Sequence, residues 1–263
     1  MRENSIKNLL AEGNKAVNGW CSTPSPFSAE VLAHAGFDSV TIDLQHGLID
    51  YQMALSMMQA INTTETPVMC RVPWLENGII MKMLDAGVAG VICPMVNNAA
   101  DAENFVAACS YPPRGRRSFG PTRAVMHWGG DYAKKANDQM LKIAMIETVE
   151  ALENMDAIMS TPGLNGIYIG PSDLSFSMGH EARLDPVEPA VVEAVATIRD
   201  NAHKHGLFCG LHCSDPAYAK DMHEKGMNLV SIPSDNRLLM GACKDWIAGA
   251  RGSNAKEEAP KSY

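Results

Sequence analysis

The sequence lacks several features that would narrow its function at once. It has no run of Lys or Arg, and its 22 basic and 30 acidic residues give a formal net charge of −8. An acidic chain without a basic run is a poor candidate for binding nucleic acid or an anionic membrane. No stretch approaches the ~18 consecutive apolar residues of a membrane-spanning helix, and the N-terminus is too polar for a secretory signal. We therefore expect a cytoplasmic protein without nucleic-acid or membrane partners.

Disulfide frameworks and the common nucleotide and hydrolase motifs are also missing. The seven cysteines are odd in number and scattered, and none forms a C-x-x-C pair, which predicts reduced thiols. The chain has no G-x-x-x-x-G-K-[ST], G-x-G-x-x-G, H-E-x-x-H or G-x-S-x-G motif. These absences argue against nucleotide hydrolysis, Rossmann-type redox chemistry, zinc proteolysis and nucleophile-elbow esterases. The predicted strands carry only Lys142, at a strand entry, so Schiff-base chemistry is disfavoured.

The sequence does have a regular alternation of short apolar runs and helical stretches. Eight strands are predicted, at 17–21, 39–43, 67–71, 90–94, 142–147, 166–170, 207–213 and 229–233. Helical spacing follows them at 28–35, 51–62, 77–86, 99–109, 148–160, 188–205, 215–225 and 236–250. Eight repeats favour an α/β fold closed into a (β/α)8 TIM barrel, with an open doubly wound sheet as the alternative.

The chain shows no Gly-, Ser- or Pro-rich linker that would divide it. We therefore expect a single barrel domain over residues 1–251, followed by a flexible, solvated tail over 252–263. Residues 110–140 form an unusually long connection, rich in arginine and aromatic side chains. Long loops in compact domains are often functional, and the pattern leaves open whether this one is a site loop or a surface excursion.

Charged side chains collect where the predicted strands end. Asp43, Arg71 and Glu147 each close an apolar run, and the run 166–170 leads directly into Pro171-Ser172-Asp173. In parallel α/β folds, the carboxyl ends of the strands share one face, and sites form there. We therefore expect these side chains to lie on one rim of the barrel.

The residue types at this rim suggest a chemistry. Glu147 and Asp173 follow neighbouring strands, which lie ~4.8 Å apart, so they could hold one ion together. Oxygen ligands with room for water and substrate suit Mg²⁺ or Mn²⁺, although a glutamate at a strand end is often only an ion-pair partner. Arg71 suits a carboxylate or an enolate oxygen. His46 suits proton transfer near neutral pH, with Asp43 orienting it.

These residues belong to a series of motifs that resembles the HpcH/HpaI family of class II, metal-dependent pyruvate aldolases. In order, the motifs are D-L-Q-H-G (43–47), R-V-P (71–73), M-L-D-A-G (83–87), Y-P-P-R-G-R-R (111–117), I-E-T (146–148) and G-P-S-D-L-S-F-S-M-G (170–179). The last is the most specific, and the likeness spans nearly the whole chain. It implies a barrel of the phosphoenolpyruvate/pyruvate-domain type. It also implies a homo-hexamer, a trimer of dimers, whose C-terminal helices are exchanged between subunits.

The resemblance implies a role for each site residue. Glu147 and Asp173 would hold the divalent metal cation, Mg²⁺ or Mn²⁺, with Co²⁺ or Zn²⁺ as further candidates. His46 and Asp43 would relay a proton at the C4 hydroxyl, Arg71 would stabilise the enolate oxygen, and Asp85 would act from a neighbouring subunit. The substrate-binding set would be Arg71, Gly170, Pro171, Ser172, Asp173, Met145 and Leu211.

The implied enzyme is a lyase of aromatic-acid or sugar-acid catabolism. It would join pyruvate or hydroxypyruvate to an aldehyde and cleave 4-hydroxy-2-oxo acids. Two residues depart from the family pattern, because Gln45 replaces the usual Glu and Met145 replaces a common Gln. Two alternatives therefore stay open. One is a citrate-lyase-β-like acyl-CoA lyase that binds CoA phosphates through Arg114, Arg116 and Arg117. The other is a non-catalytic keto-acid binder.

Overall fold

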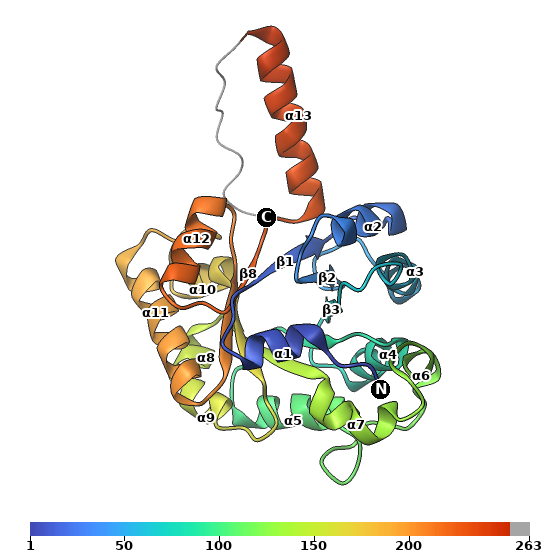
Figure 1. The fold of residues 1–263 in the computed structure, drawn as a ribbon. Helices are drawn as coiled ribbons and strands as arrows, with labels where there is room; N and C mark the ends of the chain where they lie inside the picture. The colour runs from blue at the N-terminus through green and yellow to red at the C-terminus, as the bar shows by residue number, and fades with distance from the viewer. Residues whose placement is uncertain (253–263) are drawn as a thin grey trace.

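A computed structural model describes residues 1–252 and shows a closed barrel of eight parallel strands (Figure 1). Each strand pairs with the next, and the last returns to the first. The closed ring confirms the predicted α/β barrel over an open sheet. The strands are β1 (Ala16–Cys21), β2 (Ser39–Asp43), β3 (Val68–Arg71), β4 (Gly90–Cys93), β5 (Leu141–Ile146), β6 (Gly166–Ile169), β7 (Phe208–His212) and β8 (Leu229–Ser231).

The strands were predictable because both of their faces are buried. Every residue of β2 to β8 is buried, between the barrel interior and the surrounding helices. A parallel strand covered on both sides reads as a continuous apolar run. No predicted strand end differs from the observed one by more than two residues.

The helices surround the barrel, and several begin behind a polar side chain that accepts from a free N–H group. Asp50, Asn98 and Asp215 cap helices in this way. The helices are α1 (Ser5–Ala11), α2 (Pro26–His34), α3 (Tyr51–Ile61), α4 (Asn77–Ala86), α5 (Ala99–Cys109), α6 (Thr122–Trp128), α7 (Tyr132–Gln139), α8 (Val149–Glu153), α9 (Met155–Met159), α10 (Pro171–Ser177), α11 (Pro189–Lys204), α12 (Pro216–Glu224) and α13 (Asp235–Arg251). The stretch 148–160, predicted as one helix, forms the short pair α8 and α9.

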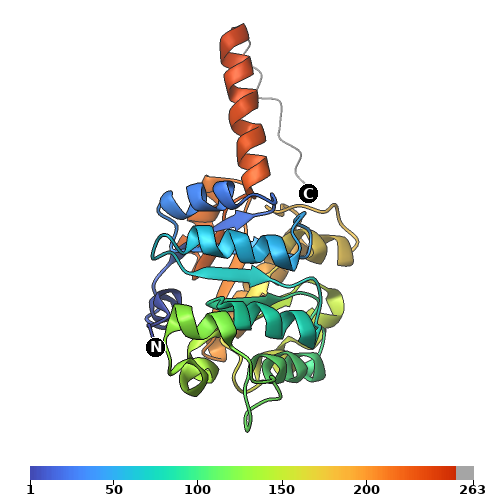
Figure 2. The same ribbon diagram turned by 90° about the vertical axis from the view of Figure 1, so that its right-hand side faces the viewer.

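The long connection at 110–140 differs from its prediction. It joins the end of α5 to the start of β5 and contains α6 and α7, so it is neither irregular nor a loop that follows a strand. Its first part projects from the side of the molecule opposite α13 (Figures 1 and 2). Because it leads into a strand, it meets the barrel at the amino ends of the strands. Within its own chain it is therefore not a loop of the rim where the charged strand-end residues lie.

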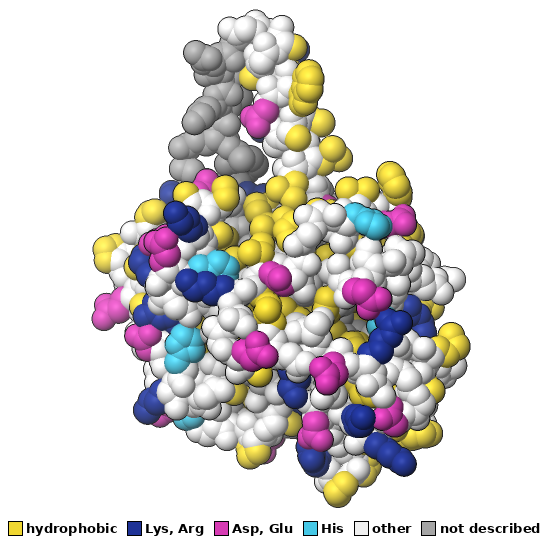
Figure 3. Space-filling view, viewed as in Figure 1, with side chains coloured by type: hydrophobic (Ala, Val, Ile, Leu, Met, Phe, Trp, Pro, Cys, Tyr) yellow, Lys and Arg dark blue, Asp and Glu magenta, His cyan; other side chains and the backbone are white. Residues whose placement is uncertain are grey.

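Helix α13 leaves the barrel body and projects outward (Figures 1 and 2). Its first residue, Asp235, is buried and accepts hydrogen bonds from the Ser22 and Thr23 N–H groups and from the Ser28 hydroxyl. Farther along, large apolar side chains are exposed, with Trp246 at 80%. Figure 3 shows hydrophobic side chains along one side of this helix and at its base.

None of the helices between residues 1 and 252 is long and apolar enough to cross a bilayer. The tail predicted at 252–263 lies, apart from Gly252, outside the described residues.

Candidate active site

Asp43 and Arg71 form a buried ion pair at the carboxyl ends of β2 and β3. The strand register places them side by side. Arg71 donates from Nε to Oδ1 of Asp43 at 2.9 Å and from Nη2 to Oδ2 at 2.6 Å. Burial alone would raise the pKa of Asp43, but the charge and hydrogen bonds of Arg71 hold that pKa below its usual value. A bidentate pair of this kind is strong and fixes the plane of both groups.

The loop that carries His46 is tied to the same carboxylate. Oδ1 of Asp43 accepts from the backbone N–H groups of Gln45, at 3.0 Å, and His46, at 3.4 Å. Asp43 therefore binds the backbone of the His46 loop, while both of its carboxylate oxygens also accept from Arg71. The His46 residue itself is exposed at the rim. Asp43 thus positions the His46 loop and orients Arg71 at once.

Trp20, at the penultimate position of β1, links this pair to the barrel interior. Its indole N–H donates to Oδ2 of Asp43 at 3.3 Å, and its ring lies 4.9 Å from the Arg71 guanidinium carbon. Trp20 is 1% exposed. A guanidinium over a desolvated indole is stabilised by a cation–π interaction. Trp20 was not a predicted site residue, because in the sequence it lies within an apolar run like an ordinary core residue.

Two further polar side chains lie beneath the rim and were not among the predicted site residues. The ring of His212 meets that of Trp20 edge-on at 4.8 Å, and the Tyr168 hydroxyl lies 3.3 Å from its Nδ1. Burial, helped by the positive charge of Arg71, lowers the pKa of His212 to about 3. This imidazole is therefore neutral at physiological pH. It forms part of a floor, made by Trp20, Tyr168 and His212, beneath the Asp43–Arg71 pair.

Glu147 lies at the end of β5 in a setting that holds its carboxylate in one place. Oε1 accepts the Met95 backbone N–H at 2.8 Å, and Met95 adopts a left-handed φ of 54°. A Cβ on Gly170 would come within 2.4 Å of Oε2, so a larger residue at this position would displace the Glu147 carboxylate. Burial, with the nearby charge of Asp173, raises the pKa of Glu147 to about 7. The positive charge of Arg71, which Asp43 already binds, offsets these effects only in part, so the buried carboxylate stays short of positive charge.

Asp173 completes the carboxylate pair. It lies exposed in the first turn of α10, and its charge reaches Glu147. Residues 1–252 contain no group of three or more His, Cys, Asp or Glu side chains that could hold a metal. Two carboxylates therefore leave most ligand positions to water and substrate, which is how Mg²⁺ is commonly bound. A divalent cation would also supply the charge that Glu147 lacks, so the donor set fits such an ion.

The structure brings most of the predicted substrate-binding residues to this rim. Gly170 and Pro171 begin α10, and the buried Ser172 hydroxyl has no hydrogen-bond partner within the described chain. Met145 precedes Glu147 by two residues, so strand alternation puts both side chains on one face. A Cβ on Gly170 would also lie 3.1 Å from the Met145 methyl carbon.

Two predicted residues lie elsewhere. Leu211 is fully buried and precedes His212, whose ring faces the barrel interior, so the Leu211 side chain faces the helix layer. Asp85 is next to last in α4, the helix that returns from the rim to the amino end of β4. It accepts from Arg117 Nη2 at 2.7 Å, at the end of the barrel away from the rim. Neither side chain joins the site of its own subunit.

A cleft of about 530 Å³ opens over the rim. It is lined by side chains that follow several strands, namely Ser22, Asp43, His46, Ser172, Asp173, Phe176, Ala182, Ser234, Asn236 and Arg237. It thus contains four of the predicted site residues.

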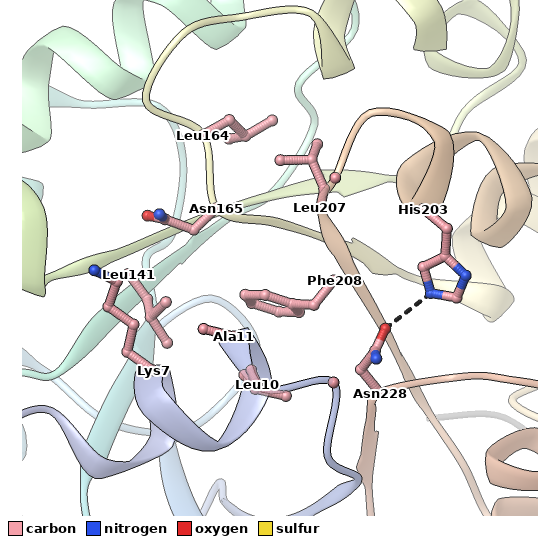
Figure 4. Close-up of a pocket in the computed structure, with 12 residues that line it drawn as sticks. Lys7, Leu10, Ala11, Leu141, Leu164, Asn165, His203, Leu207, Phe208 and Asn228 are labelled. Atoms are coloured by element: carbon pink, nitrogen blue, oxygen red, sulfur yellow. Dashed lines mark hydrogen bonds between the residues drawn. The ribbon is translucent and has the colours of Figure 1, made fainter.

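A second hollow, of about 480 Å³, lies at the opposite end of the barrel between α1 and the amino ends of the strands (Figure 4). Its wall is mixed, with the apolar Leu10 and Phe208 facing into it and the polar Lys7, Asn165, His203 and Asn228 also lining it. Two of its polar residues bond each other, His203 Nε2 to Asn228 Oδ1 at 2.9 Å. None of the predicted site residues lines this hollow. The chemistry therefore belongs to the rim cleft.

Comparison with known proteins agrees with this geometry. Residues 18–242 match the model of the HpcH/HpaI aldolase/citrate lyase family. The chain belongs to this family. A hydroxypyruvate/pyruvate aldolase of Rhizorhabdus wittichii is 38% identical over 94% of this chain and 99% of its own length. A 4-hydroxy-2-oxo-heptane-1,7-dioate aldolase of Escherichia coli is 35% identical over 99% of this chain and 100% of its own.

The solved structures include an HpcH/HpaI aldolase/citrate lyase family protein from Burkholderia cenocepacia. Its TM-score with this chain is 0.89 at 29% identity, and the match covers 94% of this chain and 99% of that one. The family predicted from the motifs is thereby confirmed.

Proposed function

We propose that this chain is a metal-dependent pyruvate aldolase that forms and cleaves 4-hydroxy-2-oxo acids. The observation that carries the proposal is the Glu147–Asp173 carboxylate pair beside the Asp43–Arg71 ion pair, on the rim of a family barrel. The names of the relatives supply the substrate class, which is pyruvate or hydroxypyruvate with an aldehyde. Cleavage of a 4-hydroxy-2-oxoheptanedioate between C3 and C4 gives pyruvate and 4-oxobutanoate.

The rim residues supply the proton transfer and part of the charge stabilisation. In cleavage, the C4 hydroxyl loses its proton as the C3–C4 bond breaks, and the bonding electrons remain on the pyruvate fragment as an enolate. Uptake of a proton at C3 then converts this enolate into pyruvate. His46, on the exposed loop held by Asp43, takes the proton of the C4 hydroxyl. In the reverse reaction, aldol addition, His46 donates the proton to the new C4 hydroxyl. Arg71, fixed by Asp43 and Trp20, stabilises the enolate oxygen. One preorganised cation of this kind is worth about 3 kcal/mol, or about a hundredfold in rate.

Glu147 and Asp173 are proposed to hold the divalent cation, Mg²⁺ or Mn²⁺, with Co²⁺ or Zn²⁺ as further candidates. Bound there, the ion would act as a Lewis acid on the donor's keto oxygen. Gly170 leaves Oε2 of Glu147 its space, and Met95 fixes Oε1. The unpartnered Ser172 hydroxyl and the start of α10 are placed to bind the donor's carboxylate.

Assembly is part of the proposal. We propose that residues 1–251 act as one barrel domain and that α13 is exchanged with a neighbouring subunit in a homo-hexamer, a trimer of dimers. The exposed apolar residues of α13, such as Leu239 and Trp246, support an interface there. Asp85 lies at the end away from its own rim, which is compatible with its acting in a neighbouring site.

A direct test measures three activities of the same preparation. Aldol cleavage, aldol addition to a panel of aldehydes, and exchange of pyruvate C3 protons into D₂O are followed with EDTA and after Mg²⁺ or Mn²⁺ is added back. We expect loss and recovery of all three, and near-normal rates for Glu147→Gln or Asp173→Asn would refute the metal assignment. His46→Ala is expected to slow cleavage more than exchange, whereas equal losses would remove the proposed role of His46.

The two alternatives make different predictions. In the described chain, the basic cluster suggested for CoA lies at the end away from the rim, and its arginines are engaged, Arg114 by Asp138, Arg116 by Asn104 and Arg117 by Asp85. This placement disfavours the acyl-CoA lyase hypothesis. Saturable binding of CoA in a titration would support that hypothesis again. A non-catalytic keto-acid binder would bind pyruvate and metal yet show no proton exchange.

A further inference from the structure

The rim cleft is larger than the donor needs. Pyruvate has six non-hydrogen atoms, which fill at most ~180 Å³ even if each takes a water's share of liquid volume, ~30 Å³. The cleft measures about 530 Å³. Most of it is therefore available to the acceptor aldehyde, and the side chains of that remaining part should select it.

Charge is unevenly distributed along the cleft. Among its described lining residues, Arg237 is the only Lys or Arg, whereas Asp43 and Asp173 are both acidic. The other arginine of the rim, Arg71, gives two of its nitrogens to Asp43. Arg237 lies in the first turn of α13, and its charge helps to lower the pKa of His212 beneath the rim. Arg237 is therefore close enough to the barrel mouth for its charge to act there.

The position of Arg237 separates it from the metal end. Asp173 follows β6 and Arg237 follows β8, so two interstrand spacings, roughly 10 Å, separate their strands. Between them the wall is partly apolar, with Phe176, 75% exposed, and Ala182. Ser234 and Asn236, which precede Arg237 in the chain, add further hydrogen-bonding groups. The cleft therefore holds its one described basic side chain between two acidic ones, Asp173 after β6 and Asp43 after β2, and its wall towards Asp173 is partly apolar.

We propose that Arg237 binds the carboxylate of the acceptor, so that the enzyme prefers short-chain aldehydes with a terminal carboxylate to neutral aldehydes. This inference rests on the proposed function and deepens it. A guanidinium binds a carboxylate with two parallel hydrogen bonds, which gives both affinity and orientation. The apolar wall near Phe176 would accept the hydrocarbon part of such an aldehyde.

Asp235, the neighbour of Arg237, gives the site rigidity. Its carboxylate binds two backbone N–H groups of the loop after β1, which fixes the first turn of α13 against the barrel. Arg237 is therefore presented from a fixed turn and not from a free helix end. Preorganisation of this kind lowers the entropy lost when a ligand is bound.

The experiment compares two acceptors of similar size with pyruvate as donor. The kcat/KM for 4-oxobutanoate is divided by that for its methyl ester, and each rate is normalised to pyruvate C3-proton exchange by the same variant. We expect wild type to prefer the carboxylate and Arg237→Gln to lower the ratio by roughly 10- to 100-fold, the range for a lost bond to a charged group. Arg237→Lys keeps the charge without the fork and should keep part of the preference.

Lys244→Gln is the matched control, because Lys244 is exposed on the same helix, lies outside the cleft and carries the same charge. It should leave the ratio unaltered. An equal ratio for wild type and Arg237→Gln, or an equal fall in Lys244→Gln, overturns the inference. A larger kcat/KM for a phosphorylated aldehyde, also lost in Arg237→Gln, overturns the choice of carboxylate. Wild type without exchange or addition refutes the proposed function itself, whereas an active enzyme with an unaltered ratio refutes this inference alone.

Discussion

The backbone N–H of Met95 donates to Oε1 of Glu147 across two neighbouring strand ends, and a left-handed φ of 54° allows it to do so. A non-glycine residue in that region costs of order 1–3 kcal/mol and persists only when its surroundings enforce it. Here the conformation fixes the carboxylate that is proposed to hold the metal.

Substitutions at Met95 should separate its backbone from its side chain. Met95→Gly accepts positive φ freely and should keep metal affinity, whereas Met95→Ile, β-branched, should resist this φ and weaken Mg²⁺ or Mn²⁺ binding about tenfold or more. Isothermal titration with each ion measures this without turnover. Equal affinity in the two variants would show that the conformation does not position Glu147.

Gly170→Ala is expected to displace Glu147. The added Cβ would lie 2.4 Å from Oε2 and 3.1 Å from both the Glu147 Cβ and the Met145 methyl carbon, so the carboxylate must move. Metal affinity should fall by tenfold or more, as measured by the same titration. Gly78→Ala in α4 is the control, because its Cβ would meet nothing within 4 Å. Wild-type affinity in Gly170→Ala would mean that Glu147 does not ligate through that oxygen.

Glu147 should make the stability of the metal-free protein depend on pH. Its pKa in the folded protein, about 7, lies above the ordinary glutamate value of 4.5. The unfolded chain therefore releases this proton first, and the unfolding free energy falls as pH rises from about 4.5 to about 7. The fall is on the order of 3 kcal/mol at 1.36 kcal/mol per pKa unit.

Urea denaturation of the metal-free protein at several pH values measures this fall, with Glu147→Gln as the matched variant. The difference between the two slopes isolates Glu147, because every other titrating group is shared. A wild-type curve that runs parallel to that of Glu147→Gln across this interval would contradict the prediction.

Trp20→Phe tests the floor beneath the ion pair. It removes the 3.3 Å hydrogen bond to Asp43 but keeps an aromatic face under Arg71. A loss of about 1 kcal/mol predicts a several-fold lower kcat with little change in the KM for pyruvate. Trp20→Leu also removes the cation–π contact and should lose more. Equal kcat values for Trp20→Phe and Trp20→Leu would show that the aromatic face under Arg71 does not contribute to catalysis.

The strand-end rule was enough to find Asp43, Arg71, Glu147 and Asp173 in the sequence. Charged residues that close apolar runs share the carboxyl rim of a parallel barrel, and the structure places all four there. The same rule could not find Trp20, because it lies within an apolar run and acts through contacts made by barrel closure.

The choice between Leu211 and His212 shows a second limit. Neighbouring residues of a strand face opposite ways, so an error of one residue exchanges the interior for the helix layer. The resemblance implies Leu211 as a substrate-binding residue, whereas in the structure the neighbouring His212 faces the interior. Which of the two faces inward depends on the stagger of the strands in the closed barrel, and apolar periodicity in a strand buried on both sides does not reveal it.

The first turn of α13 connects the wall of the cleft to the proposed subunit interface. Ser234, Asn236 and Arg237, beside the anchored Asp235, form one wall of the cleft, and the same helix then extends its apolar side away from the barrel. In the proposed hexamer, the contacts that seat that helix would also steady the wall proposed to bind the acceptor. Dilution that separates the subunits of such a hexamer should therefore reduce selectivity for the acceptor before it weakens binding of pyruvate.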